Sequence, residues 1–357
     1  MIRHKLMTSV TRSGCAVRRH QAGFSMIELM VSITLGLLIM AVVLTLYLNL
    51  SRNNTELAKM NWQIENGRFT IQILQQELWH AGFWGTYNAP SLLYASPPAT
   101  IPDPCVAYSS WDASYITLMY AIPVQGYMPG SLPSCITNPQ PDSDVLVVRH
   151  AATCVVGDAD CEAYNQDKLY LQNQGCVNTG HANYVASAAS NPVLGTPGTT
   201  VYQKNCTTPA DKRKLITSIF YVRNYATTAG DGIPTLVRAD LGLSGGDVVM
   251  QSAQALIDGV QSLKLEYGRD IDDDGSPDVF ENCASCTAID WGNVMAVQVH
   301  VLARNRETSL GYTDSKTYTL GPTVLGPFND GFKRHVYSSY IRLVNPSGRR
   351  DKTGVTP

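Results

Sequence analysis

The sequence predicts an α+β fold, in which a long N-terminal helix packs on an antiparallel β-sheet head with disulfide-tethered loops. Three observations predict it. No proline occurs between Phe24 and Asn88, so one helix can occupy most of that stretch. The C-terminal third contains segments in which apolar and polar residues alternate, as in half-buried strands. Eight of the nine cysteines follow residue 100, which is typical of loops held by disulfides.

The helix begins with an apolar run. From Leu29 to Leu50 there are 22 residues with no charge and no proline. At about 1.5 Å per residue, such a run can cross a bilayer as a helix, and we assign 24–50 to the membrane. Glu28 lies at the start of this run. A carboxylate inside a bilayer costs roughly 2.5–3.5 kcal/mol, so Glu28 should have a partner.

The pattern then changes to that of a helix with one apolar face. Apolar residues recur at spacings of three, four and seven, at Leu57, Met60, Ile64, Ile71, Leu74 and Leu78. We expect one helix over 24–81, with His80 in its last turn and Gly82 as its stop. Gly67 is a weak point inside it. The alternative is two helices broken near Ser51–Thr55.

A basic leader precedes the helix. Residues 1–22 carry five basic residues and no acid, and the basic ones are Arg3, Lys5, Arg12, Arg18 and Arg19. Lys and Arg beside an apolar segment stay cytoplasmic, so the rest of the chain should lie outside the inner membrane. The small residue Gly23 stands before the apolar core, whereas a secretory signal has its cleavage site after the core. Cleavage after Gly23 would leave the whole helix on the mature protein.

The junction resembles the class III leader of type IV pilins and type II secretion pseudopilins. The matching residues are Gly23, Phe24, Ser25, Ile27, Glu28 and Leu29. The resemblance implies that a prepilin peptidase cuts between Gly23 and Phe24 and N-methylates Phe24. It also implies that Glu28 neutralises the terminal amine of a neighbouring subunit during assembly. The alternative is a plain anchor whose Glu28 reaches the lipid headgroups.

We expect a β-rich head over 82–357, with a loop-rich part at 83–214 and a sheet at 215–345. The first strands are expected at Tyr115–Tyr120, Asp144–Arg149, Lys168–Gln172, Leu215–Arg223 and Pro234–Arg238. Alternation predicts three more at Leu263–Tyr267, Val297–Val301 and Tyr337–Leu343.

The cysteines indicate an oxidising compartment. Cys15 lies in the leader, and an even set remains: Cys105, Cys135, Cys154, Cys161, Cys176, Cys206, Cys283 and Cys286. Sequence leaves their pairing open, and we expect local pairing in chain order. Cys283 and Cys286 form a C-x-x-C, which we interpret as a short structural disulfide or as two halves of separate bridges, because the context of a redox or zinc motif is missing.

An acidic loop follows the first alternating strand of the C-terminal third. It matches a calcium-loop pattern with candidate ligands Asp270, Asp272, Asp274, Ser276, Asp278 and Glu281. Calcium takes six to eight oxygen ligands, and acids this close repel one another without a cation. We expect a structural Ca²⁺ ion here. The alternative is a solvated Asp-Gly turn.

Two further segments resemble PilW-type minor pilins. One joins Glu65–Arg68 to Leu74–Gly85; the other includes Leu263–Gly268, Trp291–Val297 and a last strand ending in Asn-Pro. The resemblance implies a pilin-like fold and a structural role in pilus assembly, in or near the tip, with twitching motility and adhesion. Implied partners are other minor pilins, the major pilin, a tip adhesin-like protein, the prepilin peptidase and the inner membrane. The implied topology is single-pass, with a periplasmic head that later joins the fibre.

The alternatives are a J-type pseudopilin of type II secretion and a calcium-dependent, membrane-anchored adhesin module. An enzyme is not expected, because no catalytic motif occurs and the histidines are scattered. Nucleic acid is not an expected partner either. The body after Gly23 keeps 22 basic and 29 acidic residues, and nucleic-acid binding needs the opposite balance.

Overall fold

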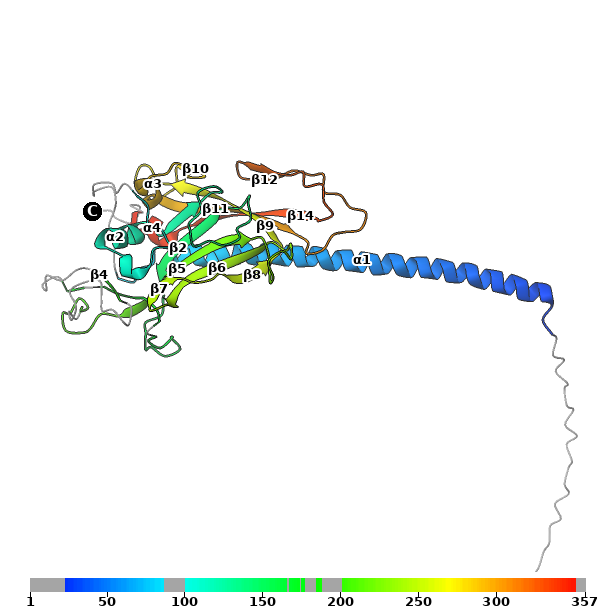
Figure 1. The fold of residues 1–357 in the computed structure, drawn as a ribbon, viewed down its shortest axis with the longest axis horizontal. Helices are drawn as coiled ribbons and strands as arrows, with labels where there is room; N and C mark the ends of the chain where they lie inside the picture. The colour runs from blue at the N-terminus through cyan, green and yellow to red at the C-terminus, as the bar shows by residue number, and fades with distance from the viewer. Residues whose placement is uncertain are drawn as a thin grey trace, which may run out of the picture. The chain divides into compact units, whose positions relative to one another are not determined.

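The computed structural model describes residues 23–86, 100–165, 167–173, 175–176, 184–187 and 201–350 (Figure 1). For 184–187 only the backbone is described. The predicted leader lies outside the described residues, except for Gly23 at its end. The chain divides into two compact units, one ending at Thr55 and the other beginning at Glu56.

A single helix, α1, runs from Met26 to His80 without the break considered near Ser51–Thr55. Gly82 follows it with a φ of +70°, a conformation that favours glycine and ends helices. The Asn345 side chain donates to the carbonyls of Trp79 and Ala81, which lie at the end of the helix. Among the described residues, α1 alone contains a stretch long and apolar enough to cross a membrane.

The larger sheet of the second unit is antiparallel and has eight described strands. Its path is β1-β2-β5-β3-β4, and β6 branches from β5 to pair with β7 and β8. The strands are β1 (Val124–Tyr127), β2 (Val145–Ala151), β3 (Tyr170–Asn173), β4 (Tyr184–Ser187), β5 (Lys212–Arg223), β6 (Thr235–Ser244), β7 (Asp247–Met250) and β8 (Gln254–Asp258).

The second sheet is also antiparallel, in the order β10-β9-β11-β14. Its strands are β9 (Val260–Arg269), β10 (Val279–Glu281), β11 (Val294–Arg304) and β14 (Arg334–Arg342). A separate hairpin joins β12 (Tyr318–Leu320) to β13 (Thr323–Leu325), and the short helices are η2 (Tyr108–Ser110), α2 (Ala113–Ala121), α3 (Ala288–Gly292) and α4 (Val344–Arg350). These elements confirm the predicted α+β fold with an antiparallel head.

One predicted strand is wrong. Tyr115–Tyr120 lies within the helix α2, whereas the other predicted segments lie wholly or largely in strands. The side chain of Asp112 accepts the backbone N–H of Tyr115 at 2.7 Å, which caps the first turn of α2. Ile116, Met119 and Tyr120 follow at helical spacing and pack in the aromatic cluster around Trp84. The apolar run was too short for its period to separate helix from strand.

The second half of α1 covers a core shared by both sheets. Leu74 and Leu78 are fully buried and pack in one cluster with residues of β2, β5, β9 and β11. Burying each such side chain contributes about 1.5–3 kcal/mol. Gly67 also has a packing reason. A Cβ atom there would lie 2.2 Å from Cε2 of Tyr337 on β14, so only glycine lets the ring lie against the helix.

Candidate assembly segment and metal loop

The predicted cleavage bond lies just outside the helix. Gly23, Phe24 and Ser25 precede Met26, where α1 begins, and none of the three is helical. Phe24 is 84 % exposed. Gly23 and Phe24 therefore lie in exposed, non-helical chain, the kind of chain in which proteolytic cleavage concentrates.

Glu28 caps the first turn of its own helix. Its Oε2 accepts the backbone N–H of Ser25 at 2.9 Å, and the Ser25 hydroxyl oxygen accepts the N–H of Ile27 at 3.4 Å. This arrangement resembles a capping box, and it places a negative charge at the positive end of the helix dipole. In the single chain the Glu28 carboxylate is thus held one residue from Phe24, whose backbone nitrogen would become the new terminal amine after cleavage.

The segment that carries Glu28 buries nothing in the single chain. Every residue from Gly23 to Thr55 is exposed, including the whole apolar run from Leu29 to Leu50. Apolar surface this extensive is not stable in water and needs lipid or other helices. The segment therefore has the physical character of a membrane anchor and of a helix–helix assembly surface.

Three of the expected calcium ligands come together in the turn between β9 and β10. The carboxylate oxygens of Asp270, Asp272 and Asp278 lie within 4.8 Å of one another. Asp270 is buried and accepts the backbone N–H groups of Asp273 and Gly275, at 2.7 and 3.0 Å. These bonds hold the turn closed around the Asp270 carboxylate. Hard cations bind such clusters of carboxylate oxygens.

Two more aspartates of the turn accept backbone hydrogen bonds within it. Asp278 accepts the N–H of Ile271 at 2.7 Å, and Asp274 accepts the N–H of Ser276 at 2.6 Å. Partial loss of hydration raises the pKa of Asp272, and the neighbouring charges of Asp274 and Asp278 raise it further. A bound cation would relieve the repulsion among these acids.

Glu281 does not join the three aspartates. We expected it to close the calcium shell, but β10 begins at Val279, so Glu281 pairs across the sheet with Tyr267. Its carboxylate contacts the guanidinium of Arg269 and lies 3.8 Å from the sulfur of Cys286. The turn closes three residues earlier than the sequence pattern assumes, and this strand pairing carries Glu281 away from the cluster.

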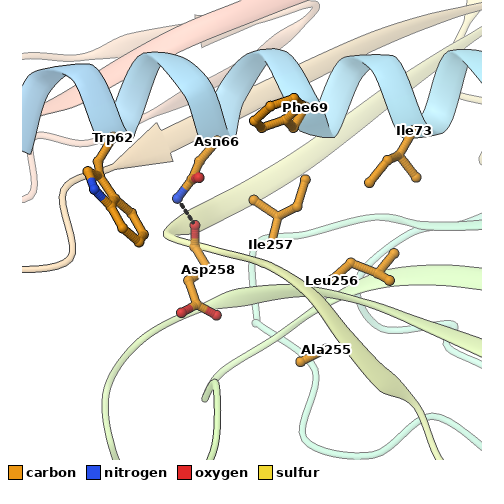
Figure 2. Close-up of a pocket in the computed structure, with 8 residues that line it drawn as sticks. All are labelled: Trp62, Asn66, Phe69, Ile73, Ala255, Leu256, Ile257 and Asp258. Atoms are coloured by element: carbon orange, nitrogen blue, oxygen red, sulfur yellow. Dashed lines mark hydrogen bonds between the residues drawn. The ribbon is translucent and has the colours of Figure 1, made fainter.

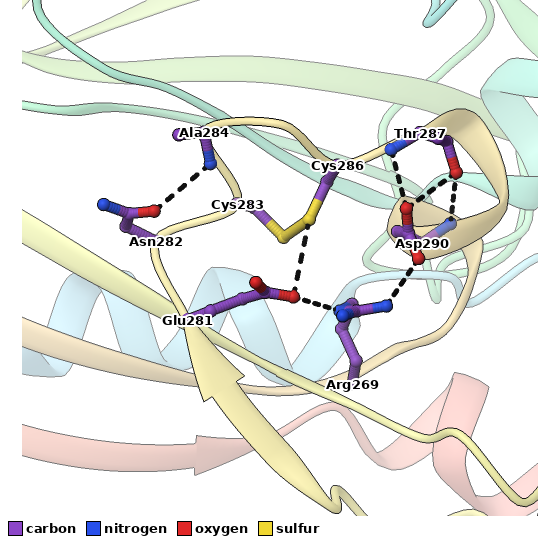
Figure 3. The surroundings of a disulfide bond; sticks show 8 residues. All are labelled: Arg269, Glu281, Asn282, Cys283, Ala284, Cys286, Thr287 and Asp290. Atoms are coloured by element: carbon purple, nitrogen blue, oxygen red, sulfur yellow. Dashed lines mark hydrogen bonds and ion pairs between the residues drawn. A yellow bond between two sulfur atoms is a disulfide. The ribbon is translucent and has the colours of Figure 1, made fainter.

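The structure pairs the eight cysteines in chain order. The disulfides are Cys105–Cys135, Cys154–Cys161, Cys176–Cys206 and Cys283–Cys286. In Figure 3, the last disulfide lies beside Glu281, which contacts Arg269, and Arg269 also reaches Asp290. Asp290 and Thr287 cap α3 reciprocally. The C-x-x-C thus closes a small loop tied to the sheet by ion pairs, consistent with a structural role.

A cross-strand chain of polar side chains includes His300. Its Nδ1 lies 2.8 Å from the hydroxyl of Ser338, and its Nε2 lies 2.9 Å from Glu266. The chain spans β14, β11 and β9 on one sheet face. A Cβ at Gly321 would lie 2.4 Å from Glu266 Oε2, so the β12–β13 hairpin covers the acidic end. We interpret the three residues as a satisfied sheet ladder.

Arg350 is the residue at the acidic turn that sequence reasoning missed. Its Nη1 lies 3.3 Å from Asp270 Oδ2, and its Nε lies 3.3 Å from Asp273 Oδ1. It comes from α4, about 80 positions along the chain. No spacing rule connects a cation to acids so distant in sequence. One positive charge therefore already balances part of the negative charge of the turn.

Two family models match the chain. Residues 219–345 match the type IV pilus-assembly protein W family, PilW, and residues 18–44 match the prokaryotic N-terminal methylation motif. The first match runs from the middle of β5 into α4, and the second contains Gly23, Phe24 and Glu28. No curated protein and no solved structure matches the chain. The matches confirm the resemblance to a PilW-type pilin, a structural pilus component rather than a known kind of enzyme.

Proposed function

We propose that this PilW-like chain is a minor pilin that helps to initiate type IV pilus assembly and lies in or near the tip complex. In that position it supports twitching motility and adhesion. The observation that carries the proposal is the joint occurrence of the two family matches: the methylation motif at the exposed, apolar first part of α1, and the PilW match over a region that includes the second sheet. The methylation motif supports incorporation of the chain into a pilus, and the PilW match relates its head to a pilus-assembly protein.

The chain would work in three steps. A prepilin peptidase removes the basic leader by cutting before Phe24 and methylates the new amine. The helix stays in the inner membrane with the head in the periplasm, as the basic residues of the leader favour. During assembly, Glu28 exchanges its bond to the Ser25 N–H for the terminal amine of a neighbouring subunit. Opposite charges in a low dielectric are stable only when they pair, so the exchange fixes the axial position of each helix.

The decisive experiment is Glu28→Gln in the full chain, with Glu65→Gln, an exposed acid on the same helix, as the matched control. The amount of this chain in sheared pili should fall at least tenfold for Glu28→Gln and stay unchanged for the control. Mass spectrometry should find N-methylated Phe24 at the mature terminus. Normal incorporation of Glu28→Gln would contradict the role of Glu28 in assembly, and absence of the unaltered chain from sheared pili would favour an adhesin that is merely anchored.

Deletion of the chain separates the pilus from the secretion alternative. A minor pilin that primes assembly should leave few or no pili when absent, with type II secretion intact. A J-type pseudopilin would give the reverse. We favour the pilus because the family match over 219–345 is to a pilus-assembly protein.

We also propose a Ca²⁺ site in the turn between β9 and β10. The donor set fits a hard cation: three carboxylates lie together, and Asp274 and Ser276 belong to the same turn. Bound calcium would neutralise the clustered acids and rigidify the turn. Asp270 would orient the site through its backbone N–H bonds, while Arg350 limits the negative charge. Glu281 is not part of this ligand set.

Calorimetry and thermal denaturation of the detergent-solubilised full chain test the site. Calcium should release or absorb heat and raise the melting temperature, and Asp272→Asn with Asp278→Asn should abolish both effects. Asp158→Asn, at an exposed position outside the turn, should retain them. Absence of heat and of a melting shift with the unaltered chain would identify the turn as a solvated one.

A further inference from the structure

The loop that follows β11 is bound to α1 at the first turns of the second compact unit. The Nζ of Lys59 donates to the carbonyl of Thr308 at 2.8 Å, and the hydroxyl of Ser309 donates to Glu56 at 2.7 Å. Lys333, just before β14, also donates to Glu56, at 2.6 Å. These bonds fix the segment from 306 to 312, which we call the 306–312 loop, against the helix.

A leucine stands at the tip of the 306–312 loop. Leu310 is 90 % exposed, the highest value among the large apolar side chains described. The turn that carries it is closed by the N–H of Tyr312, which donates to the carbonyl of Ser309 at 3.2 Å. Gly311 has a φ of +74°, as a type II turn requires at this position, and an added Cβ would meet nothing within 4 Å. The tip therefore presents Leu310 to open space.

A buried salt bridge holds the base of the loop. Asp314 and Arg334 lie 2.7 Å apart, and both side chains are almost wholly buried. The Asp314 carboxylate also accepts the hydroxyls of Tyr312 and Tyr318, at 3.1 and 2.9 Å. A buried polar network whose members are bonded in this way rigidifies its surroundings. The leucine is thus held away from the head by a fixed support.

The charges of the loop are balanced and paired. Its acid, Glu307, lies 3.6 Å from Lys59. Its base, Arg306, lies 3.7 Å from the carboxylate of Asp258 on β8, and the carbonyl of Asp258 accepts the side-chain amide of Asn66 at 2.8 Å (Figure 2). A partner that reaches the loop therefore meets an apolar tip without net charge.

The helix positions that hold the loop follow the membrane segment closely along the chain. Glu56 comes six positions after Leu50, the last residue of the apolar run, in the same helix. Six helical residues span about 9 Å. The headgroup layer on each side of the hydrocarbon core is roughly 5–7 Å thick. When the apolar run spans a bilayer, Glu56 therefore lies within a few ångströms of the lipid surface.

We propose that the 306–312 loop contacts the surface of the inner membrane before assembly and inserts Leu310 at the boundary between headgroups and acyl chains. The inference rests on the proposed function, because it needs α1 anchored in the bilayer. Lipid fits the tip better than protein does. A stable protein interface buries about 800 Å² on each side, far more than one leucine supplies, whereas an apolar side chain enters the lipid interface readily. The loop is a second membrane contact, which the chain gives up when α1 leaves the bilayer.

Photo-crosslinking of the full chain in phosphatidylethanolamine–phosphatidylglycerol nanodiscs tests the proposal. A photoreactive leucine analogue at position 310 should form a lipid adduct that mass spectrometry identifies. The matched control is Leu243, an exposed leucine in the β6–β7 hairpin, which should give at least tenfold less adduct. Its strand partner Val248 packs in the cluster around Trp84, which follows the C-terminal end of α1. Equal lipid labelling at both positions, or an adduct of position 310 only with a second copy of the chain, would overturn the proposal.

A third position separates this proposal from the proposed function. Leu38 lies inside the apolar run, so the same analogue there should label lipid. If position 38 labels lipid and position 310 does not, the loop proposal fails alone. If neither position labels lipid, the membrane anchoring that the proposed function needs fails, and the loop proposal fails with it. Because the analogue keeps the size and polarity of leucine, the experiment examines the loop in its folded form.

Discussion

The two parts of helix α1 share one secondary structure but differ in environment. From Met26 to Thr55 every residue is exposed, whereas from Glu56 to His80 five are buried, namely Gln63, Gly67, Thr70, Leu74 and Leu78. Backbone hydrogen bonding is the same in both parts, so it cannot explain why only one belongs to a folded head. The difference comes from side-chain packing, which supplies most of the stability of helices in proteins.

This difference assigns separate tasks to the two parts. Substitutions before Thr55 should change anchoring and assembly without changing the stability of the head. Substitutions on the buried face after Glu56 should change head stability first. The following predictions compare matched positions in the two parts.

The largest effect is expected from truncating a buried leucine. Leu78 is fully buried, so Leu78→Ala should lower the free energy of unfolding of the head by about 2–5 kcal/mol. Leu38 is 64 % exposed, and Leu38→Ala should leave that free energy unchanged. Urea denaturation of the detergent-solubilised full chain, followed by tryptophan fluorescence, measures both. Equal losses of unfolding free energy for the two variants would show that the two parts of α1 contribute equally to the stability of the head.

Glycine substitutions should give smaller effects, which differ in sign between the two parts of the helix. Gly67→Ala places a methyl group against the Tyr337 ring and should destabilise the head by about 1–3 kcal/mol. Gly36 has no atom within 4 Å of the added methyl, so Gly36→Ala should be neutral or favour its helix by up to about 1 kcal/mol. The same denaturation assay applies. A stabilising Gly67→Ala would mean that the ring does not lie against the helix.

Glu56, the first residue of the second unit, should give the smallest effect. Its carboxylate accepts a hydrogen bond from Lys333 at 2.6 Å and one from Ser309 at 2.7 Å, and these bonds lower its pKa below 4.5. A lowered folded-state pKa stabilises the fold above the unfolded pKa, and this stabilisation is lost as pH falls through the folded value. Because the side chain is 32 % exposed, the contribution should stay below about 1 kcal/mol.

The measurement for Glu56 is the pH dependence of unfolding below pH 4.5. Glu56→Gln should flatten part of the decline seen with the unaltered chain, and Glu65→Gln should leave it unchanged. Identical pH profiles for all three chains would show that the bonds of Glu56 to Lys333 and Ser309 do not stabilise the fold.

Local patterns predicted the regular elements well. The proline-free run gave the length of α1, and alternation gave the strands around Leu263–Tyr267, Val297–Val301 and Tyr337–Leu343. Tyr115–Tyr120 was wrong because a short apolar run fits either period, and the cap at Asp112 selects the helix. Glu281 was misplaced because a sequence motif specifies spacing but not the strand pairing that turns a ligand away.

The sequence by itself determined the features that depend on neighbouring residues: the basic leader, the junction at Gly23 and Phe24, the apolar run and the acidic turn. Tertiary structure decided what depends on residues far apart in the chain. It brought Arg350 to Asp270, placed Tyr337 against Gly67 and joined Asn66 of α1 to Asp258 of β8. Helical and strand periods are written into successive residues, whereas these contacts follow from how the helix and the sheets pack, which no local pattern encodes.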